Sequence, residues 1–373
     1  MSASVYLHCD VDKMYYGVEA LERPELASDT RVVIIGADPR EYPRGIVTTA
    51  NGVARAIGIT SGLSTAIAQR MAAERGLETV FIPPRHSVYA EYSRRLMDLL
   101  RTETEGLEQR SIDEAAMEWQ QHGFALEPVQ RLRRRILDEI GLSVSFGLAA
   151  NLLVAKMASE VAKGHDNHVC MVLPGQEQEF LAPLPIRALI GVGPKSEARL
   201  HALGVQTIGD LAARPVEQLV DLFGSAYGRY LHRASHGEDD SSLNQAPLSR
   251  SISAEHTFAR DTVDRAEIWR MLRAQADEVA SRLRADGLRA GEVAIKLRYG
   301  VSFETITRQQ RLGTPTAEPA ILAAGAAALM RKAWTRRPIR LIGLRAARLE
   351  PPSPAEQLVL PVAETSSGLS KTT

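Results

Sequence analysis

Short apolar runs alternate with longer amphipathic segments through the first half of the chain. Four runs rich in β-branched or apolar residues and bounded by turn-forming residues predict strands at 5–10, 31–36, 79–83 and 143–148. Between them, apolar residues recur every three or four positions, which is the spacing of an amphipathic helix. The two clearest stripes are Val88, Tyr92, Leu96 and Leu99, and Val129, Leu132, Ile136 and Ile140. This pattern predicts an α+β core.

The last third of the chain repeats the pattern with more positive charge. One helix is predicted from the stripe Ile268, Leu272, Ala276, Val279 and Leu283. From 293 to 299 apolar residues alternate with polar ones, and the polar positions include Lys296 and Arg298, so one face of this strand is buried and the other carries cations. Further strands are expected at 305–308 and 340–349. The polar segment 239–248 has no periodicity and predicts a linker.

Length and composition point to an ordinary globular protein with several domains. The chain has 373 residues, 45% hydrophobic and 24% charged, and a single core rarely exceeds about 250–300 residues. No apolar run approaches the ~20 residues of a membrane span, and the first residues lack a signal-peptide pattern, so we expect a cytoplasmic protein. Cys9 and Cys170 lie in apolar runs without metal-ligand spacing and are expected to be packed thiols.

The charge is unevenly distributed, although the chain as a whole is neutral. Residues 249–350 carry a net charge of +8, whereas 1–167 carry −4 and 168–248 carry −3. A basic C-terminal segment is typical of a module that holds phosphates, with an arginine-rich domain of another kind as the alternative.

Acidic residues occur where two predicted strands could bring them together. Asp10 ends the first apolar run and is expected to leave its strand at the edge of the core, and Ser111-Ile112-Asp113-Glu114 precedes a predicted strand at 115–119. Grouped carboxylates repel one another unless a cation joins them, and two divalent ions clamp the attacking and leaving oxygens in phosphoryl transfer. The pattern therefore indicates a Mg²⁺ centre. The alternative is solvated surface, because the chain has 45 Asp and Glu residues.

A glycine-containing turn followed by a helical pattern indicates a helix-hairpin-helix. Gly191 and Gly193 precede Lys195, and Ala198, Leu200 and Leu203 follow at helical spacing. Glycines at a helix N-terminus let backbone N–H groups approach a phosphate. The alternative is an ordinary glycine turn.

Several ordered blocks of sequence together resemble the Y-family translesion DNA polymerases of the bacterial polymerase IV type. The resemblance covers roughly residues 4–350. Its blocks are 7–12 (LHCDVD), 44–51 (RGIVTTAN) with 54–55, 111–115 (SIDEA), Asn151 with 155–156, 158–159 and Lys163, the hairpin, and in the last module Glu255, 257–258, 282–284, 296–299 (KLRY) and 307–308.

The resemblance implies the fold of a right-handed polymerase. Its palm is expected at 1–13 and 81–167, with small fingers at 14–80. A helix-hairpin-helix thumb is expected at 168–238, the linker at 239–248 and a C-terminal α+β little finger at 249–350, followed by a tail at 351–373.

The resemblance also implies which residues hold the metal. Asp10, Asp113 and Glu114, with the backbone carbonyl of Val11, match the ligands of two Mg²⁺ ions, for which Mn²⁺ can substitute. Spacing alone would add Asp12 to this set, but the family pattern assigns it no direct metal role.

The nucleotide pocket follows the family pattern only in part. Tyr15 matches the steric gate against a ribose 2′-OH, with a core tyrosine as the alternative. Thr49, Arg55 and Lys163 match the triphosphate contacts. The departures are Met14 and Tyr16 beside the gate, Gly52 in place of a tyrosine, Ala56 and Leu152 where a basic residue is common, and Gly164 in place of a proline. Triphosphate binding is therefore expected to depend more on Arg55 and Lys163.

Contacts to DNA and to a protein partner complete the expected site. The residues expected to contact DNA are Gly191, Gly193, Lys195, Lys296, Arg298, Thr307 and Arg308. The segment 357–361 resembles the peptide that docks bacterial polymerases on the sliding clamp, through Gln357, Leu358 and Leu360, with Pro361 in place of the aromatic residue. The alternative is a tail with chance leucines.

The resemblance implies a monomeric enzyme that adds deoxynucleotides from dNTPs to the 3′-OH of a primer on a DNA template, with low fidelity, during repair and damage tolerance. One alternative is a catalytically silent DNA-binding adaptor of the same fold, against which the intact acids argue. The other is a two-metal nuclease, for which no motif supplies a water-activating base.

Overall fold

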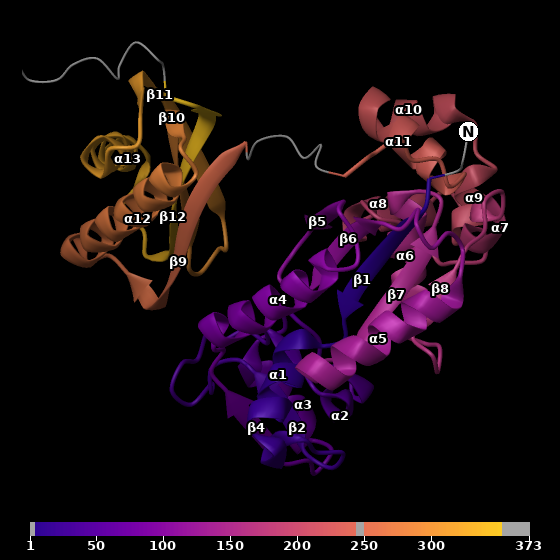
Figure 1. Cartoon of the computed structure of the whole chain (residues 1–373). Helices are drawn as coiled ribbons and strands as arrows, with labels where there is room; N and C mark the ends of the chain where they lie inside the picture. The colour runs from indigo at the N-terminus through magenta and orange to yellow at the C-terminus, as the bar shows by residue number, and fades with distance from the viewer. Residues whose placement is uncertain (1–3, 244–249, 353–373) are drawn as a thin grey trace, which may run out of the picture. The chain divides into compact units, whose positions relative to one another are not determined.

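The protein forms two compact units, Met1–Ala246 and Pro247–Thr373. The computed structural model describes residues 4–243 and 250–352 (Figure 1). The division between the units falls inside the predicted linker at 239–248, of which 244–248 lie outside the described residues. The predicted clamp-binding residues Gln357, Leu358 and Leu360 also lie outside them. No helix in the described residues is both long and apolar enough to cross a membrane.

A five-stranded sheet forms the centre of the first unit, in the order β5 (Leu107–Gln109), β6 (Glu114–Glu118), β1 (Tyr6–Val11), β7 (Val144–Ala149) and β8 (Val169–Met171). β1 is antiparallel to both of its neighbours, and β7 is parallel to β8. Side chains alternate between the two faces along a strand. Leu7, Cys9 and Val11 therefore share one buried face, with α4 (His86–Arg101) and α5 (Leu126–Ile140) packed against it.

The opposite face of the sheet bears the polar residues of β1 and is covered by α6 (Leu152–Ala162). Gly147 of β7 permits this packing: a Cβ there would lie only 1.9 Å from the carbonyl oxygen of Ala155 and 2.3 Å from the nitrogen of Ser159. A side chain at this position would collide with the helix backbone. The contact holds α6 directly over His8 and Asp10, and His8 Nδ1 lies 2.9 Å from Ser159 Oγ.

Two smaller parts complete the first unit. The segment after β1 contains α1 (Met14–Glu22), a 3₁₀ turn (Pro24–Leu26), α2 (Gly52–Ala56) and α3 (Thr65–Ala73). Its small sheet has the order β3 (Thr49–Ala50), β2 (Val32–Ile35) and β4 (Thr79–Ile82). The residues after β8 are helical: α7 (Glu177–Leu181), a 3₁₀ turn (Ile186–Ala188), α8 (Pro194–His201), α9 (Ile208–Ala212), α10 (Val216–Phe223) and α11 (Ser225–Ser235).

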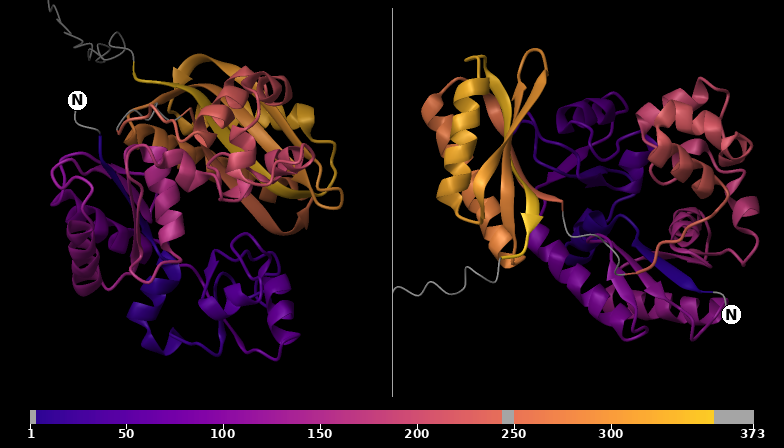
Figure 2. Two further views of the ribbon diagram at one scale, coloured as in Figure 1. Left: turned by 90° about the vertical axis from the view of Figure 1, so that its right-hand side faces the viewer. Right: turned by 90° about the horizontal axis from the view of Figure 1, so that it is seen from above.

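The second unit is a four-stranded antiparallel sheet with two helices on one face (Figure 2). The strand order is β11 (Thr305–Thr316), β10 (Arg289–Tyr299), β12 (Ile339–Glu350) and β9 (Ser251–Thr262). α12 (Arg265–Ala285) and α13 (Pro319–Ala333) cover one face. The predicted stripe from Ile268 to Leu283 is buried in this core, which confirms the expected helix and its orientation.

The predicted strands and helices of both units are present, with ends that shift by a few residues, but two expectations need correction. Asp10 does not leave its strand at the edge of the core. β1 is the central strand and continues to Val11, whose N–H donates to the Asp113 carbonyl oxygen at 2.9 Å. The strand expected at 305–308 extends to Thr316, because ladder pairing with β10 continues through polar residues that show no apolar alternation.

A buried carboxylate joins α1 to α4. The side chain of Glu19 is fully buried and accepts hydrogen bonds from Arg85 (2.9 and 2.8 Å) and from the hydroxyl of Tyr89 (2.7 Å), and it also pairs with Arg23. Burial alone would raise the pKa of Glu19, but the hydrogen bonds from Arg85 and Tyr89 outweigh it and hold the pKa below its ordinary value. The charged carboxylate is therefore the stable form at neutral pH.

Glu19→Ala is expected to lower the free energy of unfolding by about 3 kcal/mol, because it leaves Arg85 and Arg23 without their shared buried partner. Urea unfolding at neutral pH measures the effect. Since the folded pKa of Glu19 is depressed, the difference from wild type should shrink as the pH falls through that pKa. Glu22→Ala, on the exposed side of the same helix, is the control and should change stability by less than about 0.5 kcal/mol. Equal effects of the two variants would contradict the assignment.

Candidate active site

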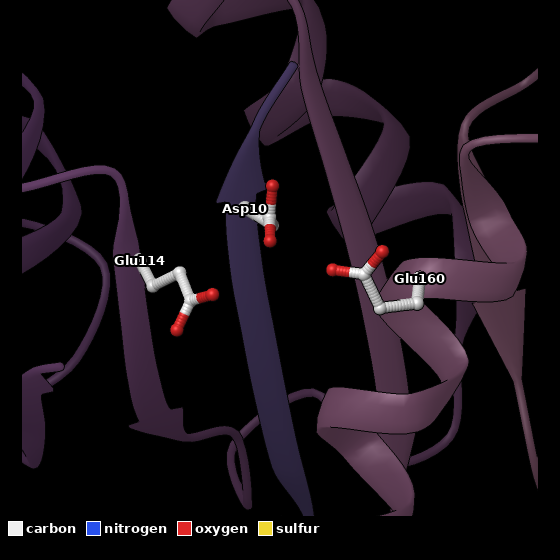
Figure 3. A group of neighbouring side chains, drawn as sticks. All are labelled: Asp10, Glu114 and Glu160. Atoms are coloured by element: carbon white, nitrogen blue, oxygen red, sulfur yellow. The ribbon is translucent and has the colours of Figure 1, made fainter. Parts of the chain in front are cut away.

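The register of the central sheet places two predicted acids directly opposite each other. Asp10 of β1 pairs with Glu114 of β6, and Glu160 of α6 reaches them from the helix that covers this face (Figure 3). One carboxylate oxygen from each of the three lies within 4.8 Å of the others. Asp10 is buried, Glu114 is half-buried and Glu160 is exposed. The three acids form a group that could hold a cation.

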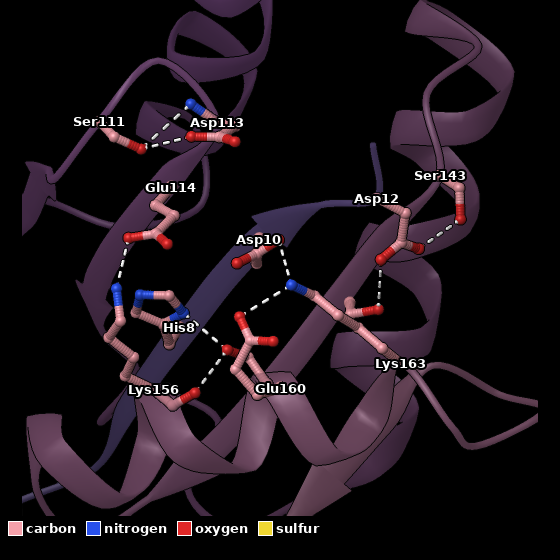
Figure 4. Close-up of polar contacts among 12 residues, drawn as sticks. His8, Asp10, Asp12, Ser111, Asp113, Glu114, Ser143, Lys156, Glu160 and Lys163 are labelled. Atoms are coloured by element: carbon pink, nitrogen blue, oxygen red, sulfur yellow. Dashed lines mark hydrogen bonds and ion pairs between the residues drawn. The ribbon is translucent and has the colours of Figure 1, made fainter. Parts of the chain in front are cut away.

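Two lysines of α6 balance this negative charge (Figure 4). Lys163 Nζ lies 2.9 Å from Asp10 and 2.8 Å from Glu160. Lys156 Nζ lies 2.6 Å from Glu114. Every carboxylate of the group therefore has an ammonium partner.

Burial dominates the electrostatics of the deepest acid. Burial, together with a smaller contribution from the neighbouring Glu160 and Glu114, raises the pKa of Asp10 to about 7, although Lys163 acts in the opposite direction. Burial lowers the pKa of Lys163, but its hydrogen bonds and charge interactions with Glu160 and Asp10 outweigh this, so its pKa lies above the ordinary value. A buried carboxylate among other acids is most stable beside a strong positive charge.

Asp113 lies at the same end of β6 but is not a member of the three-acid group. Its carboxylate accepts a hydrogen bond from Ser111 Oγ at 2.5 Å, and its carbonyl oxygen accepts from the N–H of Val11 at 2.9 Å. The segment 111–114 thus ties the start of β6 to the end of β1. It also turns the Asp113 side chain toward the cavity described below.

Asp12 is engaged elsewhere. Its carboxylate accepts hydrogen bonds from Ser143 (2.8 Å) and Ser145 (2.9 Å), and His168 Nδ1 lies 3.0 Å away. These contacts hold Asp12 against β7 and the turn before β8. This arrangement is consistent with the expectation that Asp12 has no metal role.

A cavity of about 1010 Å³ brings the predicted nucleotide-binding residues together with the acids. It is lined by parts of the chain that are far apart in sequence: the end of β1, the first turns of α1, β3, α2, the 111–114 segment and the end of α6. The predicted residues among its lining are Asp10, Val11, Tyr15, Thr49, Arg55, Asp113, Glu114 and Lys163.

Aromatic stacking holds Tyr15 in the cavity wall. Its ring stacks on Tyr89 at 4.3 Å with an interplanar angle of 16°, and meets the edge of His86 at 5.9 Å. Tyr89 is in turn hydrogen-bonded to the buried Glu19. The Tyr15 ring is therefore fixed by a chain of contacts that ends in the core.

The cationic side of the cavity is built on β3 and α2. Arg55 Nη2 donates to Thr49 Oγ1 at 3.4 Å, and Arg55 Nε donates to the carbonyl oxygen of Ala50 at 3.3 Å. At Gly52, which departs from the family pattern, a Cβ would lie 3.9 Å from Lys13 Nζ. Lys13 also lines the cavity, so a lysine stands beside the space that the missing tyrosine side chain leaves.

The sequence analysis did not identify three residues of the site: Glu160 and Lys156, of which Glu160 lines the cavity and Lys156 pairs with Glu114, and Lys13, which lines the cavity. A signal for the first two existed, because Lys156, Glu160 and Lys163 are spaced by four and three positions and so share one face of a helix. The sequence did not indicate that this face meets Asp10 and Glu114. The sequence did not indicate that Lys13 belongs to the site, because its position depends on the turn between β1 and α1.

The residues predicted to contact DNA lie in two other regions. In the helical part of the first unit, Gly191 has φ +88° and Gly193 precedes the first turn of α8, where Lys195 is exposed. A positive φ of this kind favours glycine.

In the second unit the sheet face away from the helices carries most of the predicted residues. Lys296 and Arg298 lie there, with Thr307 opposite Lys296. Lys296 pairs with Glu255 at 2.9 Å. Arg308, however, is opposite the buried Ile295 and so belongs to the other face, which the alternation along β11 requires.

Family models match most of the chain. The impB/mucB/samB family model matches residues 9–160, its C-terminal domain matches 249–360, and a thumb-domain model described for DNA polymerase iota matches 187–239.

Curated relatives named DNA polymerase IV match along nearly the full chain. The protein from Dehalococcoides mccartyi strain CBDB1 is 37% identical over 319 residues, which cover 84% of this chain and 79% of the relative. The protein from Methanoculleus marisnigri is 35% identical over 350 residues, which cover 93% and 94%.

Solved structures share the fold. A Y-family DNA polymerase chimera has a TM-score of 0.79 at 22% identity, covering 93% of this chain and all of that one. An insertion ternary complex of Dbh DNA polymerase has a TM-score of 0.63 at 21% identity, covering 92% and 98%. Together with the family models and the curated relatives, this likeness shows that the chain belongs to the Y family of translesion DNA polymerases, in the group whose curated members are named DNA polymerase IV.

Proposed function

We propose that this low-fidelity translesion polymerase extends a primer by two-metal nucleotidyl transfer, with Asp10, Asp113 and Glu114 as the metal ligands. The observation that carries the proposal is the direct pairing of Asp10 with Glu114 at the floor of a cavity that Tyr15 and Arg55 also line. Template, primer and dNTP are the substrates that this family membership implies.

The residues present fit divalent metal ions. Hard carboxylate oxygens are the donors that Mg²⁺ prefers, and the raised pKa of Asp10 shows that its buried charge needs more compensation than Lys163 supplies. The Val11 carbonyl and Glu160 are further oxygen donors at the same place. Mn²⁺ would satisfy the same donors.

Bound Mg²⁺ ions would lower the pKa of the primer 3′-OH and neutralise charge on the leaving pyrophosphate. The chain's own residues position the reactants. Lys163 pairs with both Asp10 and Glu160. We propose that its ammonium group contacts the triphosphate when bound metal ions would balance the charge of Asp10 in its place. Asp113 is oriented for its role by Ser111.

Thr49 and Arg55 are proposed to hold the triphosphate from the opposite wall. A guanidinium presents several N–H donors in a fixed plane, which suits phosphate oxygens. The contacts of Arg55 to Thr49 and Ala50, at 3.4 and 3.3 Å, hold it in place while its other donors face the cavity.

Tyr15 is proposed as the steric gate. Its stacking on Tyr89 prevents the ring from retreating, so a 2′-OH above it would meet a rigid surface. Met14, although largely buried, lines the cavity beside the gate, as Tyr16 does.

The contacts to DNA are proposals as well. Gly191, Gly193 and Lys195 are proposed to bind a DNA phosphate at the start of α8, and Lys296, Arg298 and Thr307 to follow the backbone along the open sheet face. Arg308 lies on the other face and would contact DNA only from the sheet edge. Clamp docking through 357–361 and a monomeric state also stay predictions.

Glu114→Gln is expected to lower kcat for primer extension with Mg²⁺ by about a hundredfold or more, because a metal ligand loses its charge. Glu118→Gln, on the same strand but exposed, is the matched control and should extend primers as wild type does. Steady-state extension of a labelled primer measures both. Unchanged extension by Glu114→Gln would refute the metal role, whereas a wild-type protein that extends no primer would favour the silent DNA-binding adaptor.

Tyr15→Ala is expected to raise ribonucleotide incorporation relative to deoxynucleotide by roughly tenfold to a hundredfold, since the clash with the 2′-OH disappears. Tyr15→Phe keeps the ring and should keep the discrimination. Single-nucleotide incorporation with matched rNTP and dNTP gives the ratio of kcat/KM values. A ratio that is the same in the alanine variant and in wild type would identify Tyr15 as a packing residue only.

Arg55→Ala is expected to raise the KM for dNTP by about tenfold, because a charge-assisted contact to the triphosphate is lost. Arg70→Ala, an exposed arginine of the neighbouring helix α3, serves as the control and should leave KM unchanged. If Arg55→Ala also left KM unchanged, the proposed triphosphate contact would be wrong.

A further inference from the structure

The hairpin between β10 and β11 ends in an exposed apolar tip. Val301 is 95% exposed and Phe303 is 59% exposed, although both lie in a domain whose other large apolar residues are mostly buried. The loop is closed where the N–H of Tyr299 donates to the carbonyl oxygen of Glu304 at 2.9 Å. An ordinary hairpin tip is polar, so these two side chains need an explanation.

The backbone holds the Phe303 ring outward. Phe303 has φ +52°, a left-handed conformation that bulky residues rarely adopt and that glycine or asparagine adopts readily. A strained conformation of this kind persists only where the surroundings enforce it, and such positions are concentrated at binding sites.

Two arginines contact the tip. The Arg340 guanidinium lies 4.9 Å from the centre of the Phe303 ring, which is 59% exposed. Arg337 pairs with Glu304 at 2.7 Å and donates to Ser302 Oγ at 2.8 Å. Two carboxylates also lie at this hairpin: Glu304 pairs with Arg337, and the Asp261 carboxylate lies beside Gly300.

We propose that the hairpin tip binds an unpaired base of single-stranded DNA, stacked on Phe303, with Arg340 on a flanking phosphate. An aromatic platform beside cations is the general solution for single-stranded nucleic acid, and the face of a base is accessible only when the base is unpaired.

This inference rests on the proposed template-directed function, because the unpaired part of a template is the single strand that such an enzyme meets. The tip adds a contact that does not involve the acids or the nucleotide cavity. It would hold a template base that has not yet been copied, which restricts the movement of the strand.

Fluorescence anisotropy of the full chain with a labelled primer-template tests the proposal, without dNTP and without divalent metal. Two substrates are compared, one with a short template overhang of thymidines and one in which abasic residues replace them. Wild type should bind the first about tenfold more tightly, since stacking contributes about 1–3 kcal/mol per base. Phe303→Trp should keep this preference. Phe303→Ala and Phe303→Leu should abolish it, because leucine keeps the apolar bulk but offers no aromatic face.

Val263→Ala, at an exposed valine of the same domain, is the control and should not alter the preference. A preference that survives in both Phe303→Ala and Phe303→Leu would overturn the proposal and leave the tip as a surface for a protein partner. An equal loss of affinity for both substrates in every variant would also overturn it. Neither result would bear on the catalytic assignment, which the Glu114→Gln extension assay tests separately.

Discussion

The close contact between α6 and β7 is the constraint on which the site depends. At Gly147 the helix backbone comes so near to the strand that a Cβ would lie 1.9 Å from a carbonyl oxygen. This approach brings Lys156, Glu160 and Lys163 of α6 over the polar face of β1 and β6. A larger residue at 147 would push the helix away and separate the lysines from the acids they balance. The grouping of acids and lysines on this face thus depends on a residue that has no side chain.

Charge balance connects this packing to function. Burial and nearby acids raise the pKa of Asp10 and Lys163 lowers it, so a cation beside this carboxylate favours its charged form. Lys163 supplies one positive charge and remains partly exposed at the cavity. The same surplus of acidic oxygens that makes the site costly to fold makes it suitable for divalent ions. Tyr15 is held by different means, through Tyr89 and the buried Glu19, so the two walls of the cavity are independently supported.

Much of the fold was predictable because its signals are local. The stripe of apolar residues at Leu96 and Leu99 predicts α4, and the alternation from Val293 to Tyr299 predicts β10 with a buried and a cationic face. The proximity of Asp10 and Glu114 was predictable as well, since both stand at strand ends and the surrounding blocks resemble a known family. The full length of β11 was not, because its ladder passes through polar residues that give no periodic signal.

By itself, the sequence determined the strands, the helices, the basic C-terminal domain and the family, because periodicity, charge and ordered motifs are properties of neighbouring residues. Only the tertiary structure decided which residues share a face: that Glu160 and Lys156 meet the acids, that Asp12 is bound by Ser143 and Ser145, and that Arg308 lies away from Lys296. The physical reason is that register and helix docking come from long-range packing. A shift of one residue in the register of a strand moves every side chain to the other face. The acids themselves do not specify which register the strand adopts.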